Sequence, residues 1–184
     1  MGINEIRGGL PEPIETARLV LRRPIFAHVP ALTELANNRK ISDMLADLPH
    51  PYTSEDAISF IENRARSETG HAFAITLRAG ALIGMCGLKL KDGNGPEIGY
   101  WLGEPHWGAG YASEAANALV DALFATGIVP SLVARAMAVN EASCHLLEKL
   151  GFSLVADRVE DCGRHAGVRV RSYALEAAAR RAAQ

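Results

Sequence analysis

The run from Trp107 to Ala112, with the sequence WGAGYA, has the residue types of a phosphate-binding turn. Gly108 and Gly110 lie two residues apart between an expected strand and an expected helix, and glycine lets the backbone turn so that several N–H groups converge. The helix that follows adds the positive end of its dipole, so a diphosphate fits such a turn without lysine or arginine. An ordinary glycine-rich turn is the alternative interpretation, and two glycines alone do not exclude it.

Two better-known phosphate motifs do not match this run. A dinucleotide-binding fingerprint needs a third glycine and a parallel sheet, whereas the strand before Trp107 follows two strands joined by short turns. A P-loop needs a glycine and a lysine followed by serine or threonine, which the run lacks. Taken alone, the run therefore favours an ordinary glycine-rich turn, and a phosphate held by backbone groups stays the alternative.

Composition narrows the class of protein. The 184 residues suit one domain, and 48% hydrophobic with 22% charged residues is ordinary for a soluble globular protein. The net charge of -2 argues against a nucleic-acid partner, which would require a basic surface. The sequence shows neither the ~18 consecutive apolar residues of a membrane span nor a signal peptide. We therefore expect a cytoplasmic protein with no nucleic-acid or membrane partner.

The cysteines do not indicate a metal centre or a disulfide framework. Cys86, Cys144 and Cys162 are odd in number, and no two of them have C-x-x-C spacing. A reducing compartment is the simplest setting for such a chain. We expect no metal.

Hydrophobic periodicity predicts one α/β domain over residues 14–176. The lead-in, residues 1–13, holds three glycines and two prolines and is expected to be flexible, and residues 177–184 are expected to fray. Strands are expected at 14–22, 72–77, 81–90, 97–102, 132–139, from 152 onward and at 168–175. Helices are expected at 28–38, at 41–46, from Thr53 for about 14 residues, after the glycine-rich run, and from Asn140. Turns at 78–80 and 92–95 favour an antiparallel meander, and the whole order predicts a mixed sheet.

Several motifs, in order along the chain, resemble the GNAT superfamily of N-acetyltransferases. The run EIGYWLGEPHWGAGYASEA resembles its acyl-CoA-binding motif, in the branch of ribosomal-protein N-terminal acetyltransferases (RimJ/RimL-like). LIGMCGL before this run and VNEASCHLLEKLGF after it match as well, and the resemblance extends from about Arg18 to Leu175. The general pattern has Gln or Arg where this chain has Trp107, and Trp is usual in this branch.

The resemblance implies a fold and a cosubstrate. The fold would be GNAT-like, with a mixed, mostly antiparallel central sheet, flanking helices and a splayed V-shaped gap. Acetyl-CoA would be the cosubstrate, with its pyrophosphate on the glycine-rich turn and its pantetheine arm along the exposed strand. The residues assigned to acetyl-CoA in this way are Tyr100, Trp101, Leu102, Trp107, Gly108, Ala109, Gly110, Tyr111, Ala112 and Asn140.

The resemblance also implies catalytic residues. Glu97 lies where histone-type members carry their base, although an acid at a strand start is as often merely solvated. RimL-like members use a later loop, which makes Glu160 and Asp161 second candidates. Ser143, in N-x-x-S, would protonate the leaving thiolate, while its alternative is an ordinary first-turn residue. A backbone N–H near Trp101 or Leu102 would stabilise the oxyanion.

The acceptor and the assembly stay open in the sequence. The acceptor would lie between residues 40–52 and 160–167, whose acidic residues Asp43, Asp47, Glu160 and Asp161 suit a cationic amine. The leading hypothesis is direct acetyl transfer to a protein N-terminal α-amine in a ternary complex. The alternatives are a small-molecule amine, such as a polyamine, amino acid or antibiotic, and a non-catalytic acyl-CoA-binding module. Dimers are common among the resembling proteins, so a homodimer is a candidate assembly.

Overall fold

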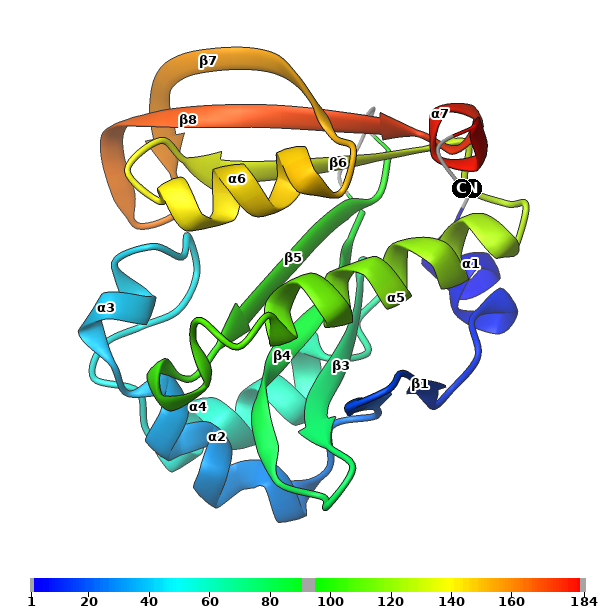
Figure 1. Ribbon diagram of the computed structural model, residues 1–184. Coiled ribbons are helices and arrows are strands. Elements are labelled where there is room, and N and C mark those ends of the chain that lie inside the picture. Colours follow the sequence, from blue (N-terminus) through cyan, green and yellow to red (C-terminus); the bar gives the residue numbers. More distant parts are fainter. Residues whose placement is uncertain (1, 91–94, 183–184) are drawn as a thin grey trace.

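One eight-stranded sheet forms the centre of the protein. The computed structural model describes residues 2–90 and 95–182, and the strand order is β1-β2-β3-β4-β5-β6-β8-β7 (Figure 1). All neighbouring strands are antiparallel except β5 and β6. The expected mixed, mostly antiparallel sheet is confirmed. The strands are β1 (Ile14–Glu15), β2 (Leu19–Arg22), β3 (Gly70–Leu77), β4 (Leu82–Lys89), β5 (Glu97–Leu102), β6 (Ser131–Met137), β7 (Ser153–Cys162) and β8 (His165–Glu176).

Helices cover both faces of the sheet. Figure 1 shows α5 and α6 on the near face and α4 behind the strands. The α-helices are α1 (Ile3–Gly9), α2 (Val29–Ala36), α3 (Arg39–Ser42), α4 (Ser54–Ser59), α5 (Tyr111–Ala125), α6 (Glu141–Lys149) and α7 (Ala177–Ala182). Short 3-10 turns are η1 (Phe26–His28) and η3 (Glu104–His106), and η2 (Phe60–Arg64) is a π-helical turn that continues α4.

Two apolar clusters follow from the alternation of side chains along the strands. On one face, Leu119 and Leu123 of α5 pack against Phe73 and Ile75 of β3 in the main core. On the other face, Leu32 of α2 belongs to a smaller cluster that also contains residues of α4 and β4. The sheet is therefore buried on both sides in its middle.

Both ends of the chain are helical within the described residues. Helix α1 occupies much of the lead-in, and its Ile3 and Ile6 are buried at the i, i+3 spacing of one helix face. Helix α7 is docked rather than frayed, because Arg180 donates to the Asp121 carboxylate at 2.9 Å and to the Leu150 carbonyl at 3.0 Å. The turn expected at 92–95 lies mostly outside the described residues.

The parallel pair β5–β6 is short, and this creates an opening in the sheet. The two strands are paired only at Glu97 with Val133 and at Ile98 with Ala134. Strand β5 nevertheless continues to Leu102 and β6 to Met137. Beyond the second pair the strands diverge, which confirms the splayed gap. Within the described ranges, no helix is long and apolar enough to cross a membrane, and no group of three metal-ligating side chains occurs.

Candidate active site

The glycine-rich turn joins the divergent end of β5 to α5. Gly108 has φ +74° and Gly110 has φ +79°, both in the left-handed region that favours glycine. Gly110 is the N-cap residue of α5, so the first N–H groups of this 15-residue helix have no intrahelical acceptor. The indole of Trp107 donates to the Leu102 carbonyl at 2.8 Å and is otherwise half exposed. The turn is therefore fixed against the end of β5 with its amides available to an anion.

An arginine that the sequence analysis did not assign also holds this turn. Arg18 donates through Nη1 to the Ala109 carbonyl at 2.9 Å and through Nε to the Glu114 carboxylate at 2.6 Å. Its guanidinium lies 4.5 Å from the centre of the Tyr111 ring. Burial raises the pKa of Glu114, but hydrogen bonds from Thr16 and Arg18 outweigh it and keep that pKa below its usual value. Glu114 is 96 residues from Arg18, so no spacing in the sequence could reveal this contact.

Two hydroxyls meet beside the opening. The Tyr100 phenol and the Ser143 Oγ are 3.1 Å apart, within hydrogen-bond distance. Burial raises the pKa of Tyr100 to about 12, so the phenol stays neutral at ordinary pH. Asn140 caps α6 by accepting from the Ser143 N–H at 3.2 Å, as predicted. A small cavity of about 70 Å³ is lined by these three residues and by Gly99.

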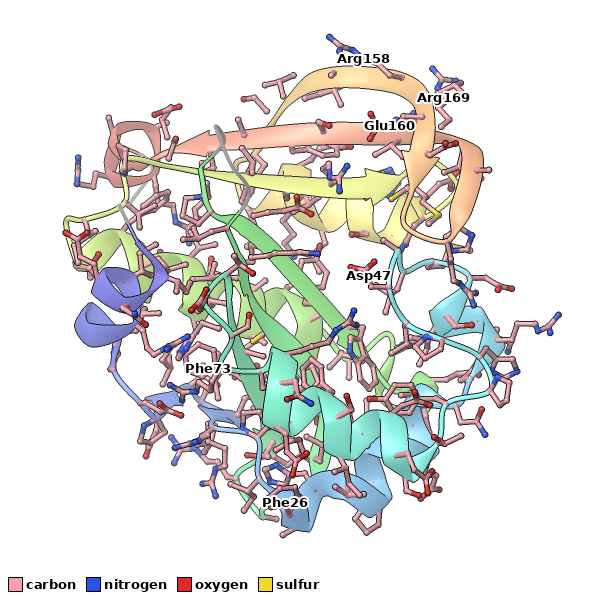
Figure 2. The ribbon with its side chains drawn as sticks, turned by 180° about the vertical axis from the view of Figure 1, so that it is seen from behind. Phe26, Asp47, Phe73, Arg158, Glu160 and Arg169 are labelled. Atoms are coloured by element: carbon pink, nitrogen blue, oxygen red, sulfur yellow. The ribbon has the colours of Figure 1, made fainter. Side chains whose placement is uncertain are left out.

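A larger cavity of about 920 Å³ lies over the α4 face of the sheet. The segment from Met44 to Pro49 forms one wall, as expected for residues 40–52, and Cys162 of β7 also lines it. Gly99 forms part of the floor, and a Cβ there would meet no atom within 4 Å, so the glycine leaves this part of the floor open. Figure 2 labels Asp47 and Glu160, which come from the α3–α4 connection and from β7 beside this region.

One guanidinium joins the two rival candidates for the base. Arg135 of β6 donates through Nε to Glu97 at 3.3 Å and through Nη1 to Glu160 at 3.1 Å. Glu97 lines the large cavity, whereas Asp161 does not and accepts instead from the Gly167 N–H at 2.9 Å. The sequence analysis did not single out Arg135. An arginine inside the apolar run LVARAMAV was the available signal.

The expected acidic walls are neutralised by arginine and lysine. Asp43 pairs with Arg164 at 3.1 Å, and Asp47 pairs with Lys89 at 3.2 Å. Since Glu160 is paired with Arg135, only Asp161 of the four expected acids lacks an ion pair within the described part of the chain. These walls are therefore mixed in charge, and three of the four acids expected to suit a cationic amine already have a cationic partner.

Comparisons with known proteins agree with this geometry. The N-acetyltransferase p20 of Bacillus licheniformis is 31% identical over 146 residues, which cover 77% of this chain and 82% of that protein. The ribosomal L7/L12 α-N-protein acetyltransferase RimL, solved with coenzyme A, superposes with a TM-score of 0.79 at 22% identity, over 90% of this chain and 98% of the other. Spermidine N-acetyltransferase from Vibrio cholerae, solved with CoA and spermine, superposes with a TM-score of 0.77 at 19% identity, over 90% and 99% of the two chains.

A family model also identifies an acetyltransferase over most of the chain. The model of the acetyltransferase (GNAT) domain matches residues 18–153. This range begins at the arginine that holds the glycine-rich turn and contains both sides of the opening between β5 and β6. The chain belongs to the GNAT family of acetyltransferases.

Proposed function

We propose that this acetyltransferase moves the acetyl group of acetyl-CoA directly to the α-amine of a protein or peptide N-terminus. The observation that carries the proposal is that the two cavities share lining residues where β5 and β6 diverge. Gly99, Tyr100 and Arg135 line both the small cavity beside Ser143 and the large cavity beside Glu97. A donor on one side and an acceptor on the other would therefore react through the gap.

The residues present fit acetyl-CoA as a substrate. Its pyrophosphate would be bound by the amides from Gly108 to Ala112, on the turn that Arg18 holds. The pantetheine arm carries amides, and the edge of β5 that faces β6 has no strand partner beyond Ile98 and offers the matching donors and acceptors. Asn140, beside the small cavity, is placed to contact the same arm.

The geometry of β5 reduces the candidates for the oxyanion donor to two backbone amides. The Gly103 N–H donates to the Ile83 carbonyl of β4, and alternate residues of a strand point the same way. The Trp101 N–H therefore faces β4, while the N–H groups of Tyr100 and Leu102 face the gap. We assign one of these two amides to the oxyanion, because it gains a hydrogen bond as the thioester oxygen becomes negative.

Two side chains would handle the protons. Glu97 would accept a proton from the attacking amine through a water molecule, and Arg135 holds its carboxylate in the cavity. Ser143 would give its hydroxyl hydrogen to the departing thiolate, while the Tyr100 phenol holds the Ser143 Oγ. No covalent acyl-enzyme is needed, because the amine attacks the thioester carbonyl directly.

The protonation of the acceptor favours an α-amine. Only a neutral amine attacks, and an α-amine has a pKa of about 7.7–8.0, against about 10.4 for lysine. At neutral pH a single carboxylate base suffices to deprotonate an α-amine. Deprotonating a lysine side chain costs much more free energy. A small-molecule amine is the second candidate, since a cavity of about 920 Å³ is within the range of small-ligand sites.

A panel of acceptors tests this function. Release of CoA thiol would be measured with peptides that have a free N-terminus and no lysine, with N-blocked peptides that contain lysine, and with spermidine and amino acids. We expect the highest kcat/KM for the free N-terminal peptides. A preference for the blocked lysine peptides or for spermidine would refute the α-amine assignment. Binding of CoA without turnover of any amine would indicate a non-catalytic module.

A further inference from the structure

The charged side chains that line the large cavity do not all have partners. Three cations line it, and two of them are paired, Lys89 with Asp47 and Arg135 with Glu97. The third, Arg64, is exposed, and its side chain makes no hydrogen bond or ion pair with any residue in the described ranges. Asp56, the remaining charged carboxylate, uses its Oδ2 in the capping box of α4, where it accepts from Thr53.

An unusual turn places Arg64 at the cavity. After α4 the chain forms the π-helical turn η2, whose i to i+5 hydrogen bond runs from the Ala65 N–H to the Phe60 carbonyl at 2.8 Å. Single π turns inside helices occur often at functional sites. Both Phe60 and Arg64 line the cavity. Tyr52 lines the cavity as well. Burial, followed by the charge of Asp56, raises the pKa of Tyr52 to about 12, and the Arg64 charge opposes this rise.

The register of the sheet gives the backbone separation between the part of the cavity beside Arg64 and the proposed base. Gly70 is opposite Lys89 in the β3–β4 pair, and Lys89 is opposite Glu97 in the β4–β5 pair. Two strand spacings therefore separate Gly70 from Glu97, which is roughly 10 Å. The Arg64 carbonyl lies beside Gly70, 3.0 Å from the position of a Cβ there. An extended chain advances ~3.3–3.6 Å per residue, so about three residues span this separation.

We infer that Arg64 binds a carboxylate of the acceptor, carried by the second or third residue when the residue with the reacting amine is counted as the first. This inference rests on the proposed function and names the class of its substrate: a peptide whose second or third residue is Asp or Glu. The amine would lie toward Glu97 and the carboxylate toward Arg64, at opposite ends of one cavity. A polyamine has no anionic group for Arg64, and it would meet two carboxylates that already have cation partners, those of Glu97 and Asp47.

Matched peptides test the inference. Pairs of tetrapeptide amides with a free N-terminus would differ only in Glu against Gln at the second or third position. For each peptide we would measure kcat/KM, and also the Kd for the enzyme saturated with CoA, by titration calorimetry without turnover. The wild-type protein should prefer the Glu peptides by about twofold to fivefold in both quantities, the range of an exposed ion pair. The Arg64→Gln variant should lose this preference, and Arg64→Lys should keep part of it.

A second arginine provides the control. Arg181→Gln on α7 removes the same charge from an exposed residue away from the cavity and should leave the preference unchanged. The inference is overturned if the wild-type protein binds the Glu and Gln peptides equally, or if Arg64→Gln retains the preference.

Failure of the α-amine proposal would be seen separately. It would appear as better turnover of blocked lysine peptides or of small amines than of free N-terminal peptides. The Arg64 contact would then be tested with small amines that carry a carboxylate roughly 10 Å from the amine, against the matching amides. A carboxylate preference that disappears in Arg64→Gln supports the contact, and its absence refutes it.

Discussion

At the opening, the hydroxyl of Tyr100, which keeps its proton, lies beside the hydroxyl of Ser143, the proposed general acid. Tyr100 keeps its proton because burial raises its pKa to about 12, and its OH is 3.1 Å from the Ser143 Oγ. The Ser143 N–H, and not its hydroxyl, is the group that Asn140 caps. The catalytic and structural contributions of Ser143 can therefore be separated by one substitution.

Replacing Ser143 by alanine should reduce turnover and spare binding. Ser143→Ala retains the capped N–H, so α6 keeps its first turn, while the proton donor to the thiolate is lost. We expect kcat to fall by ~10²-fold, at the lower end of general-acid effects, with little change in the Kd for acetyl-CoA. Tyr100→Phe should cause a smaller loss. Single-turnover kinetics would measure both, and an unchanged chemical rate in Ser143→Ala would show that Ser143 is only a helix residue.

Glu97 and Glu160 can be distinguished because they share Arg135. Removing either charge leaves Arg135 paired with the other carboxylate, so both variants should fold. Glu97→Gln should lower kcat/KM by ~10²-fold if Glu97 is the base, and Glu160→Gln should have a much smaller effect. Steady-state kinetics on a peptide acceptor would decide. The opposite order of the two effects would move the base to β7.

The site residues that the sequence predicted are those with local signals. Asn140 and Ser143 are three residues apart, and the two glycines lie in one short turn, so a motif contains each pair. Arg135, which joins two carboxylates, was missed because its partners lie 38 and 25 residues away in the chain. Ion pairs between strands depend on the register and the direction of the strands, and no short segment of the sequence predicts these.

At the scale of elements, most of the strands and the last two long helices were predicted because each has a clear period and a marked end. The single strand expected at 14–22 was wrong, because this segment turns back on itself to form β1 and β2, which pair antiparallel. Helix α1 was missed because the three glycines and two prolines of residues 1–13 outweighed the short spacing of Ile3 and Ile6. The helix from Thr53 was expected to run for about 14 residues, yet it is α-helical only to Ser59 and then widens into η2. A π turn has no composition signal of its own, since it depends on what the helix packs against.

The glycine-rich turn can be tested against another turn with the same backbone strain. Gly110→Asp would place a carboxylate where the pyrophosphate is proposed to bind, so we expect CoA affinity to fall at least tenfold, about 1.4 kcal/mol. Gly80, with φ +96° in the β3–β4 turn, is the matched control. Gly80→Asp should cost similar stability without altering CoA binding. Calorimetric titration of both folded variants checks this, and equal CoA affinity in the two would place the phosphate site elsewhere.

For the whole molecule, a buried histidine links α1 to the sheet. The His71 side chain is 2% exposed, and its Nδ1 accepts from Arg7 Nε at 3.2 Å. Burial, followed by the charges of Arg66 and Arg7, lowers the pKa of His71 to about 4, although Glu12 opposes this. The folded protein therefore holds His71 neutral at pH values where the unfolded chain would protonate it.

This difference predicts a loss of stability in acid. Because the pKa is lower in the folded state, the unfolded chain binds more protons between pH ~6.5 and ~4, and stability falls as the pH falls through that window. The full effect would be about 3 kcal/mol, from 1.36 kcal/mol per pKa unit. His71→Gln should flatten this part of the profile, as measured by urea denaturation at several pH values. Identical slopes in the two proteins would contradict the assignment.

The two residue pairs between β5 and β6 also have a mechanical consequence. They divide the sheet into one part of five strands and another of three, joined by only these two residue pairs. Acetyl-CoA bound in the gap would contact both parts of the sheet, so its binding would also stabilise the fold. At a CoA concentration one hundred times its Kd the gain is about 2.7 kcal/mol, or roughly 5–10 °C in Tm for a domain of this size. Amide hydrogen exchange should slow most along the facing edges of β5 and β6, where the ligand takes the place of the hydrogen bonds that the two strands do not make with each other.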